Sequence, residues 1–303
     1  MNGFPTKILL ATDGSEDATL AARAAVDLSK ETGSELHVVH VLPRFPRHAY
    51  PGITPEVYSY MMDETYKEAR RLLDEEAKRL EDGGGRVAET HVRRGQFVDE
   101  ILDLAEEIEA GLILMGSRGL GPVKRLLLGS VAEGVVHHAP SPVLVARGGE
   151  EAWPPERVVI GDDGSEAATR AGELAAKIGR LFGARGLIVQ VYPRLLEVDV
   201  EGRKLNARLI NDELRREERE LEGRATEVEE YLGKRPNIRI ATVGDTAAVL
   251  LEAAEEEDAP EKTLLAVGSR GLGPVQRVRL GSVSTKVLRA ARGPILVYPR
   301  PRD

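Results

Sequence analysis

The 303-residue sequence contains no cysteine. This absence excludes disulfide bonds, thiolate metal ligands and cysteine nucleophiles, and it fits a reducing cellular compartment. Aromatic residues make up only 4% of the chain, so we expect a core built from Ala, Val, Leu and Ile. With 42% hydrophobic and 30% charged residues, the composition is that of a packed globular protein rather than a disordered one.

Long apolar runs are also missing. No stretch approaches the ~20 apolar residues that a membrane span requires. The amino-terminal segment MNGFPTKILLATDGS has one lysine and an apolar run that is too short for the core of a secretory signal. We therefore expect a cytoplasmic protein that does not contact a membrane.

A basic excess is absent as well. The formal net charge is −8, and residues 1–152 hold 17 Lys and Arg against 25 Asp and Glu, whereas residues 153–303 hold 25 of each. Domains that bind nucleic acids carry clustered positive charge. The sequence therefore gives no reason to expect a nucleic-acid partner.

A repeat of a whole domain is the main positive feature. GSRGLGPVKRLLLGSV starts at Gly116 and GSRGLGPVQRVRLGSV starts at Gly268, and 13 of the 16 paired residues are identical. ATDGSEDATLAARAA at Ala11 also matches GDDGSEAATRAGELA at Gly161. We predict two tandem domains, residues 1–147 and 157–303. The Gly and Pro pairs around residues 148–156 indicate a linker between them.

Strands alternate with helices in both copies. In the first copy we expect strands at 7–12, 35–41, 87–92, 112–116 and 142–146, and helices at 16–32, 55–82, 97–109 and 130–138. In the second copy we expect strands near 157–162, 186–192, 238–243, 263–267 and 294–298. This alternation predicts an α/β fold in which helices cover both faces of a parallel sheet. Ligands of such sheets bind beyond the carboxyl ends of the strands, where the strand order reverses.

The repeated glycine segment follows the fourth strand of each copy. Glycine allows a ligand to approach the backbone closely and can adopt a positive φ. Gly129 and Ser130 open the following helix, whose free N–H groups suit a phosphate. The Ser130 hydroxyl can donate to that phosphate or cap its own helix. The segment therefore favours a phosphate-containing ligand.

The spacing Gly-x2-Gly-x9-Gly-Ser, together with an Asp at the end of the first strand, resembles the ATP-binding branch of the universal stress protein family. The resemblance covers nearly the whole chain as two tandem domains. It implies two Rossmann-like domains, related to adenine nucleotide α-hydrolases, each with a five-stranded sheet of order 3-2-1-4-5. It also implies ATP as the ligand, with or without Mg²⁺, or else ADP or AMP.

The family motif assigns a role to each matching residue. It implies that Ala11, Thr12 and Asp13 border the adenosine and that Val41 contacts the adenine. Ribose and phosphates are then held by Gly116, Gly119, Gly129, Ser130 and Val131, with Arg118 and Arg125 as nearby cations or as solvated side chains. In the second copy the matching residues are Asp163, Val191, Gly268, Arg270, Gly271, Gly281, Ser282 and Val283.

The second copy departs from the first where Asp162 replaces Thr12. Neighbouring residues of a strand point to opposite faces, so only one of Asp162 and Asp163 has to face a nucleotide. An additional carboxylate repels a polyphosphate, although Arg279 stands nearby in the sequence to offset it. We therefore expect the first site to bind ATP more tightly than the second.

Other familiar chemistry is not supported by the sequence. It lacks the P-loop pattern GxxxxGK[ST], the dinucleotide pattern GxGxxG and the nucleotidyltransferase motif HxGH. His37 and His40 are three residues apart on one strand and point to opposite faces, so they cannot share a metal ion. His137 and His138 lie at a helix end, where capping is expected. No metal site is predicted.

Three functions remain open at this stage. The first is a nucleotide-binding regulatory or sensor protein in a stress response, which is not an enzyme. The second is a slow ATPase or phosphotransferase with Asp13 as the base. The third is a nucleotide-free scaffold. The intact glycines argue against it, because we expect only a close ligand or a positive φ to require glycine at these positions. The resemblance also implies that the last strands of the two domains pair, and whether two chains form a homodimer is left open.

Overall fold

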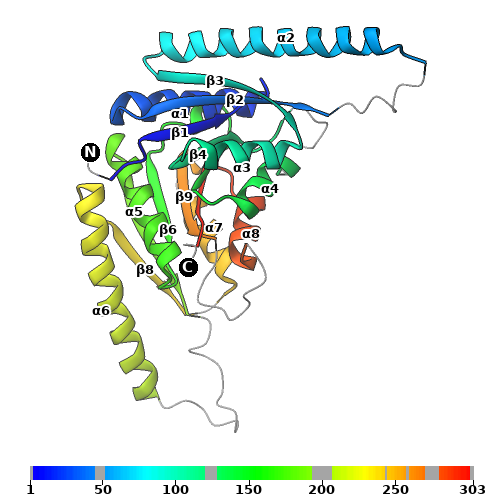
Figure 1. Ribbon diagram of the computed structural model, residues 1–303. Coiled ribbons are helices and arrows are strands. Elements are labelled where there is room, and N and C mark those ends of the chain that lie inside the picture. The colour runs from blue at the N-terminus through cyan, green and yellow to red at the C-terminus, as the bar shows by residue number, and fades with distance from the viewer. Residues whose placement is uncertain are drawn as a thin grey trace. The chain divides into compact units, whose positions relative to one another are not determined.

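The computed structural model describes residues 3–44, 52–119, 128–192, 207–242, 244–256, 259–269 and 280–300 (Figure 1). The chain divides into two compact units, residues 1–146 and 147–303. Within each unit, helices cover both faces of a parallel five-stranded sheet, as expected for a doubly wound α/β fold. Among the described residues, no helix is long and apolar enough to cross a membrane.

The first unit alternates strands and helices from its start to its end. Its elements are β1 (Lys7–Ala11), α1 (Glu16–Thr32), β2 (Glu35–Pro43), α2 (Pro55–Asp82), β3 (Arg86–Gly95), α3 (Phe97–Glu107), β4 (Leu112–Gly116), α4 (Ser130–His138) and β5 (Val143–Ala146). The strands are parallel in the order β3-β2-β1-β4-β5. Strand order therefore reverses between β1 and β4, which places a crevice at their carboxyl ends.

The second unit repeats this order. Its elements are β6 (Arg157–Gly161), α5 (Glu166–Leu181), β7 (Arg185–Val191), α6 (Ala207–Leu232), β8 (Asn237–Ala241), α7 (Thr246–Glu255), β9 (Thr263–Gly268), α8 (Ser282–Ala290) and β10 (Ile295–Tyr298), with 3₁₀ turns at Glu150–Ala152 and Pro260–Lys262. The strand order is β8-β7-β6-β9-β10. The predicted order 3-2-1-4-5 is thus confirmed in both units.

The central strands are apolar because both of their faces are covered. Ile8, Leu9 and Leu10 of β1 are completely buried, as are Leu112, Ile113 and Leu114 of β4. A strand with one solvent-facing side alternates apolar and polar residues, whereas a doubly covered strand does not. The continuous apolar runs of the sequence therefore identify these two strands as the centre of the sheet.

The start of α1 is fixed by its capping residue. The Ser15 hydroxyl accepts a hydrogen bond from the Ala18 N–H (3.2 Å), and the helix ends at Gly33 in the left-handed conformation, with φ of 76°. A serine N-cap and a glycine C-cap satisfy backbone groups that a helix leaves unpaired at its ends. Ser165 caps α5 through Ala168 in the same way, so both copies place the turn after their first strand identically.

Residues 148–156, predicted as a linker, belong to the second compact unit, which begins at Arg147. Trp153 is only 2% exposed and makes an edge-to-face contact with Phe182, with 5.4 Å between the ring centroids. The neighbouring Ala152 is completely buried. This segment therefore contributes side chains to the core of the second unit.

Candidate functional site

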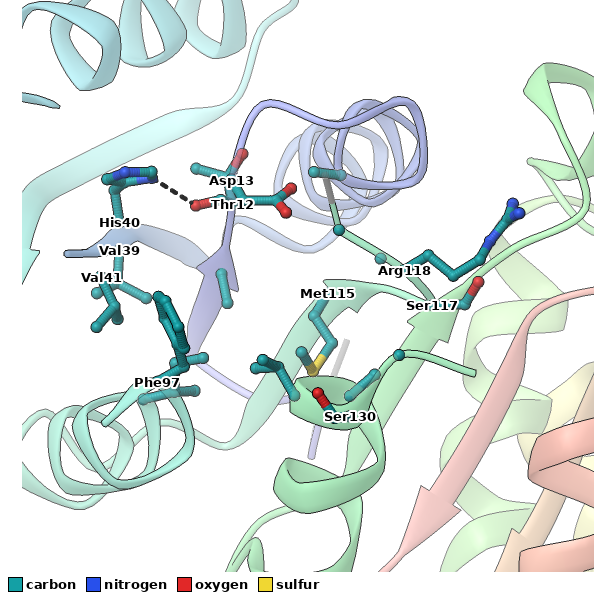
Figure 2. A pocket seen from close by; sticks show the side chains of 18 of the residues that line it. Thr12, Asp13, Val39, His40, Val41, Phe97, Met115, Ser117, Arg118 and Ser130 are labelled. Carbon is teal, nitrogen blue, oxygen red and sulfur yellow. Dashed lines mark hydrogen bonds between the residues drawn. The ribbon is translucent and has the colours of Figure 1, made fainter. Parts of the chain in front are cut away.

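A cavity of about 430 Å³ lies at the carboxyl ends of the central strands of the first unit (Figure 2). Small-molecule sites typically have volumes of about 300–1,000 Å³. The cavity is lined by Ala11, Thr12, Asp13, Ala18, Val39, His40, Val41, Pro43, Phe97, Ile101, Met115, Gly116, Ser117, Arg118, Gly119, Gly129, Ser130, Val131 and Ala132. It therefore occupies the position where strand order reverses between β1 and β4.

All ten residues that the sequence predicted for the first site line this cavity. They are Ala11, Thr12, Asp13, Val41, Gly116, Arg118, Gly119, Gly129, Ser130 and Val131. The prediction missed α3 and, apart from Val41, the residues at the end of β2, among them Phe97, Ile101, His40 and Pro43. Phe97 is the first residue of α3 and is separated from β3 only by Gln96, so its place shortly after a strand end was the signal available in the sequence.

One side of the cavity is apolar. Figure 2 shows Val39, Val41 and Phe97 grouped at one end, with Met115 between them and Ser130. Val41 and Met115 are buried, whereas Phe97 is 40% exposed and stands at the rim. An exposed aromatic ring beside buried aliphatic side chains gives a flat, apolar surface that suits a planar ring.

The other side presents the start of α4. Gly129 is the N-cap residue, and it has no side chain to accept from the first turn of the helix. By contrast, Ser15, Thr54, Ser165 and Asp245 cap their helices with side-chain oxygens. The first N–H groups of α4 thus lack a side-chain cap, and a helix N-terminus in this state attracts anions.

Ser130 does not cap its own helix, so this alternative from the sequence is wrong. Ser130 is the first residue of α4 and comes after the N-cap, and its side chain is exposed. Figure 2 shows it across the cavity from Thr12 and Asp13. Ser282 has the same position in α8, after the N-cap Gly281. Both hydroxyls are therefore available to a ligand at the helix start.

Asp13 is held by the turn that joins β1 to α1. Its Oδ1 accepts a hydrogen bond from the Ser15 N–H (3.1 Å), and Oγ of Ser15 donates to the Arg118 carbonyl (3.1 Å). A Cβ at Gly119 would lie 2.2 Å from Asp13 Oδ2. Gly119 thus lets the carboxylate approach the backbone of the glycine segment, and this turn and that segment form one wall of the cavity.

Gly116 is required for packing rather than for a ligand. A Cβ at this position would lie 2.6 Å from the backbone carbon of Asp17 and 2.8 Å from the Ala18 nitrogen. Gly268 has the same role in the second unit, where a Cβ would lie 2.8 Å from the Ala168 nitrogen. Neither glycine has a positive φ. The expectation that only a ligand or a positive φ requires the motif glycines is therefore wrong, and they do not by themselves exclude a scaffold.

The guanidinium of Arg118 is held by the carboxylate of Asp17. Its Nε and Nη2 atoms donate to the two carboxylate oxygens of Asp17, each at 3.0 Å, and Oγ of Ser117 donates to the same carboxylate at 2.5 Å. Figure 2 shows the Arg118 side chain pointing away from Thr12 and Asp13. Arg118 is thus not an isolated solvated cation, because its guanidinium is paired with Asp17. Arg125 lies outside the described residues.

We expect Asp17→Ala to lower the free energy of unfolding by about 2–3 kcal/mol, since it removes the acceptor of three hydrogen bonds, two of them from a cation. The second unit has Ala167 at this position. Denaturant unfolding followed by circular dichroism measures the effect. Glu31→Ala, an exposed change on the same helix, should shift the value by less than about 0.5 kcal/mol. Equal effects of the two variants would contradict the prediction.

In the second unit, Asp162 does not act as an additional free negative charge. It is 8% exposed, it forms an ion pair with Arg224 of α6, and its Oδ1 accepts from the Gly164 N–H (2.8 Å). Burial alone lowers the pKa of the Arg224 guanidinium, but Asp162 raises it above its ordinary value. The repulsion argument for a weaker second site therefore fails, because Arg224 neutralises Asp162. Arg279 lies outside the described residues.

The remaining residues of the predicted second site follow the arrangement of the first. Asp163 accepts a hydrogen bond from the Ser165 N–H (3.0 Å), as Asp13 does from Ser15. Val191 ends β7, Gly268 ends β9, and Gly281, Ser282 and Val283 form the start of α8. Arg270 and Gly271 lie outside the described residues, so the wall that they would form is not described.

Two sequence comparisons and one structural comparison agree on the relatives of this chain. The family model described as "Universal stress protein family" matches residues 5–147 and again 155–299. A universal stress protein of Methanocaldococcus jannaschii is 33% identical over 141 residues, which cover 46% of this chain and 81% of that protein. A universal stress protein of Mycolicibacterium smegmatis is 26% identical over 304 residues and covers 97% of both chains.

A solved structure matches nearly the whole length of the chain. The crystal structure of a universal stress protein from Archaeoglobus fulgidus superposes with a TM-score of 0.67 and 26% sequence identity. The match covers 97% of this chain and 98% of that chain. The tandem organisation is therefore shared along the full length of that protein.

Proposed function

The chain belongs to the universal stress protein family, and we propose that its first unit binds an adenine nucleotide, ATP in the first place, in the cavity between β1 and β4. The observation that carries this proposal is the glycine-capped start of α4, which lies across the cavity from its apolar end. A ligand for such a site needs a flat apolar part and an anionic part. Adenine nucleotides have both.

The apolar end suits the base. Val39, Val41 and Phe97 offer aliphatic and aromatic surface, while the Thr12 carbonyl already accepts a hydrogen bond from Nδ1 of His40 (2.9 Å). This hydrogen bond fixes the imidazole at the rim and leaves its other nitrogen for the ligand or for water. We place the adenine at this end and the ribose near Asp13.

The phosphates then extend toward Gly129 and Ser130. The N–H groups at the start of α4 and the Ser130 hydroxyl are hydrogen-bond donors, and the partial positive charge of the helix start favours an anion. Arg118 does not add to this attraction because it is paired with Asp17. The affinity for the phosphates therefore depends on backbone groups and on Ser130.

We infer a binding role rather than hydrolysis. Asp13 is the one carboxylate among the described residues that line the cavity. Its Oδ1 accepts from Ser15 and its Oδ2 lies against Gly119, so the side chain supports the wall of the site. A regulatory protein whose conformation or partner depends on the bound nucleotide fits this arrangement. Phosphate release over many turnovers that Asp13→Asn abolishes would instead support an ATPase.

Ser130→Asp tests the phosphate position. We expect it to weaken ATP binding at least about tenfold, which corresponds to ~1.4 kcal/mol, because the new carboxylate repels the phosphates. The free protein should unfold at the same temperature or a higher one, since an acidic residue in the first turn stabilises a helix by about 0.3–1 kcal/mol. Isothermal titration calorimetry and thermal unfolding provide the two measurements.

Two controls make this result specific. Repulsion at ~4 Å requires two like charges, and adenosine has no phosphate for the new carboxylate to repel. Its affinity should therefore change less than about twofold in Ser130→Asp. Ser282→Asp places the same charge at the start of α8 and shows whether the second unit contributes a site. If Ser130→Asp leaves ATP binding unchanged in a folded protein, the phosphates do not lie at α4 and the proposal is wrong.

A further inference from the structure

A cluster of two histidines and a glutamate lies on the edge strand β3 of the first unit's sheet and on its neighbour β2. His37 belongs to β2, and Glu89 and His91 belong to β3. One potential ligand atom from each residue lies within 4.8 Å of the other two. His40, which the sequence paired with His37, points instead to Thr12. His37 and His40 therefore point to different faces, as strand alternation predicts, and His91 is the histidine that the sequence did not bring to notice.

An irregularity in β3 brings the three side chains together. Leu36 pairs with Val87, but the next residue, His37, pairs with Glu89, so Ala88 is an additional residue in β3. Paired residues of neighbouring strands point to the same face, and one additional residue reverses the faces of all that follow. If β3 paired regularly from Val87 onward, His37 would lie opposite Ala88 and His91 would lie on the other face of the sheet.

The distances suit a tetrahedral metal ion. Nδ1 of His37 and Nε2 of His91 are 3.2 Å apart. Two imidazole nitrogens that bind one Zn²⁺ at ~2.0–2.1 Å in tetrahedral geometry are about 3.3 Å apart. The Glu89 Oε2 atom is 3.8 Å from Nε2 of His91, and its side chain is 64% exposed, so a small rotation completes a third ligand.

The two ring nitrogens that face each other are those that a metal would use. His37 is 8% exposed, and its Nδ1 lies against Nε2 of His91, whereas its own Nε2 is on the other side of the ring and has no hydrogen-bond partner among the described residues. A metal ion between the two rings would therefore bind Nδ1 of His37 and Nε2 of His91.

The surrounding charges permit a cation. Glu35 and Glu89 act on His37, and Glu107 acts on His91. Lys7 and Arg93 oppose them, but Nζ of Lys7 donates to the Ile108 carbonyl (3.0 Å) and Arg93 is paired with Glu107. Both cations are thus held by other acceptors, and neither is bonded to the cluster.

The described residues of the second unit hold no counterpart of this cluster. Leu187 stands at the position of His37, and it pairs with Asn237, while Val189 pairs with Arg239. The guanidinium of Arg239 is held by Glu256. The cluster therefore does not follow from the fold that both units share, and the second unit serves as an internal comparison.

We propose that His37, Glu89 and His91 form a binding site for a divalent transition-metal ion, with Zn²⁺ as the best match to their nitrogen and oxygen donors and to their spacing. The three residues supply three of the four ligands of a tetrahedral ion. Because Glu89 is exposed, the fourth position is open to water or to a ligand from another molecule. The site is separate from the nucleotide cavity, so it does not depend on the proposed function.

The test uses the full chain without an affinity tag, freed of metal with a chelator. We expect calorimetric titration with Zn²⁺ to show one tight site per chain, and Co²⁺ to give the visible absorption of a tetrahedral complex. Glu89→Gln and His91→Gln should each lower the Zn²⁺ affinity about 10–100-fold. Zn²⁺ should also raise the unfolding temperature of the unchanged chain more than that of either variant.

His138→Gln is the matched control, because His138 is exposed and its Nδ1 bonds to the Gly134 carbonyl (2.8 Å) at the end of α4. Its Zn²⁺ affinity should equal that of the unchanged chain. Circular dichroism checks that each variant folds. Because Glu89 is exposed, Glu89→Gln still provides the test if His91→Gln fails to fold. Binding that His138→Gln removes, or that both cluster variants retain, would overturn the proposal.

Discussion

Replacing Gly116 by Ala is expected to lower the free energy of unfolding of the nucleotide-free protein by about 3 kcal/mol, the upper range for overpacking a core. The added Cβ would meet backbone atoms of Asp17 and Ala18 at 2.6 and 2.8 Å. A side chain can rotate away from such a contact, but these atoms belong to the first turn of α1. The strand or the helix would have to shift.

Denaturant unfolding followed by circular dichroism measures this loss. The matched variant Gly268→Ala should behave similarly, and the single tryptophan, Trp153, reports on it because it is buried in the second unit. Gly223→Ala is the control: its Cβ would meet nothing within 4 Å in α6, and it should stabilise the protein by about 0.5–1 kcal/mol. A Gly116→Ala variant as stable as the unchanged protein would show that the helix tolerates displacement.

Arg224→Ala should cost about 3 kcal/mol, because it leaves the Asp162 carboxylate buried without its counter-ion. The side chain of Asp162 is 6% exposed and that of Arg224 is 25% exposed, so little water can replace the guanidinium. Beside this pair, burial and a hydrogen bond to Glu217 raise the pKa of Tyr192. Tyr192 therefore stays a neutral phenol and adds no second negative charge beside Asp162.

The first unit suggests the control for this pair. Thr12, at the position of Asp162, accepts from the Gly14 N–H (3.3 Å) without needing a cation. In an Asp162→Thr background, Arg224→Ala should therefore cost less than about 1 kcal/mol, and a double-mutant cycle gives the difference as the coupling. Trp153 fluorescence follows the unfolding of this unit. Equal costs of Arg224→Ala in both backgrounds would show that the pair does not stabilise the protein.

The fold could be predicted because the sequence repeats its own signals. Continuous apolar runs such as LILM mark doubly covered strands, and Ser15 and Ser165 mark helix starts that the structure has at Glu16 and Glu166. The long charged helix was predicted at its observed bounds, Pro55–Asp82. Such features depend on neighbours in the sequence, and the strand order followed from the family resemblance.

The site was predicted less completely, because its details depend on contacts between distant residues. Nothing local to Arg118 indicates that Asp17, 101 positions away, holds its guanidinium. The same is true of Asp162 and Arg224, which are 62 positions apart. Motif matching identified which residues gather at the strand ends, but only the structure shows which charges are already neutralised there.

His37 and His91 were missed for a different reason. Strict alternation along β3, counted from its start, places Glu89 and His91 on the wrong face, and the position of an additional residue within a strand is not encoded by any motif in the sequence. The alternation of side chains along a strand, read from the sequence, does not show where an additional residue shifts that alternation by one position.

The unpaired residue Ala88 has one more consequence, which concerns tolerance to insertions and deletions. It divides β3 into a short inner part, in phase with Leu36, and a long outer part of opposite phase that carries Glu89, His91 and Arg93. Deleting Ala88 would make Val87 and Glu89 consecutive, so that they could pair with Leu36 and His37 in a regular ladder and the outer part would keep its phase. A one-residue deletion within the outer part, at Thr90 for example, would instead turn the side chains that follow to the other face. This edge strand should therefore tolerate the loss of Ala88 far better than a change of length at a later position.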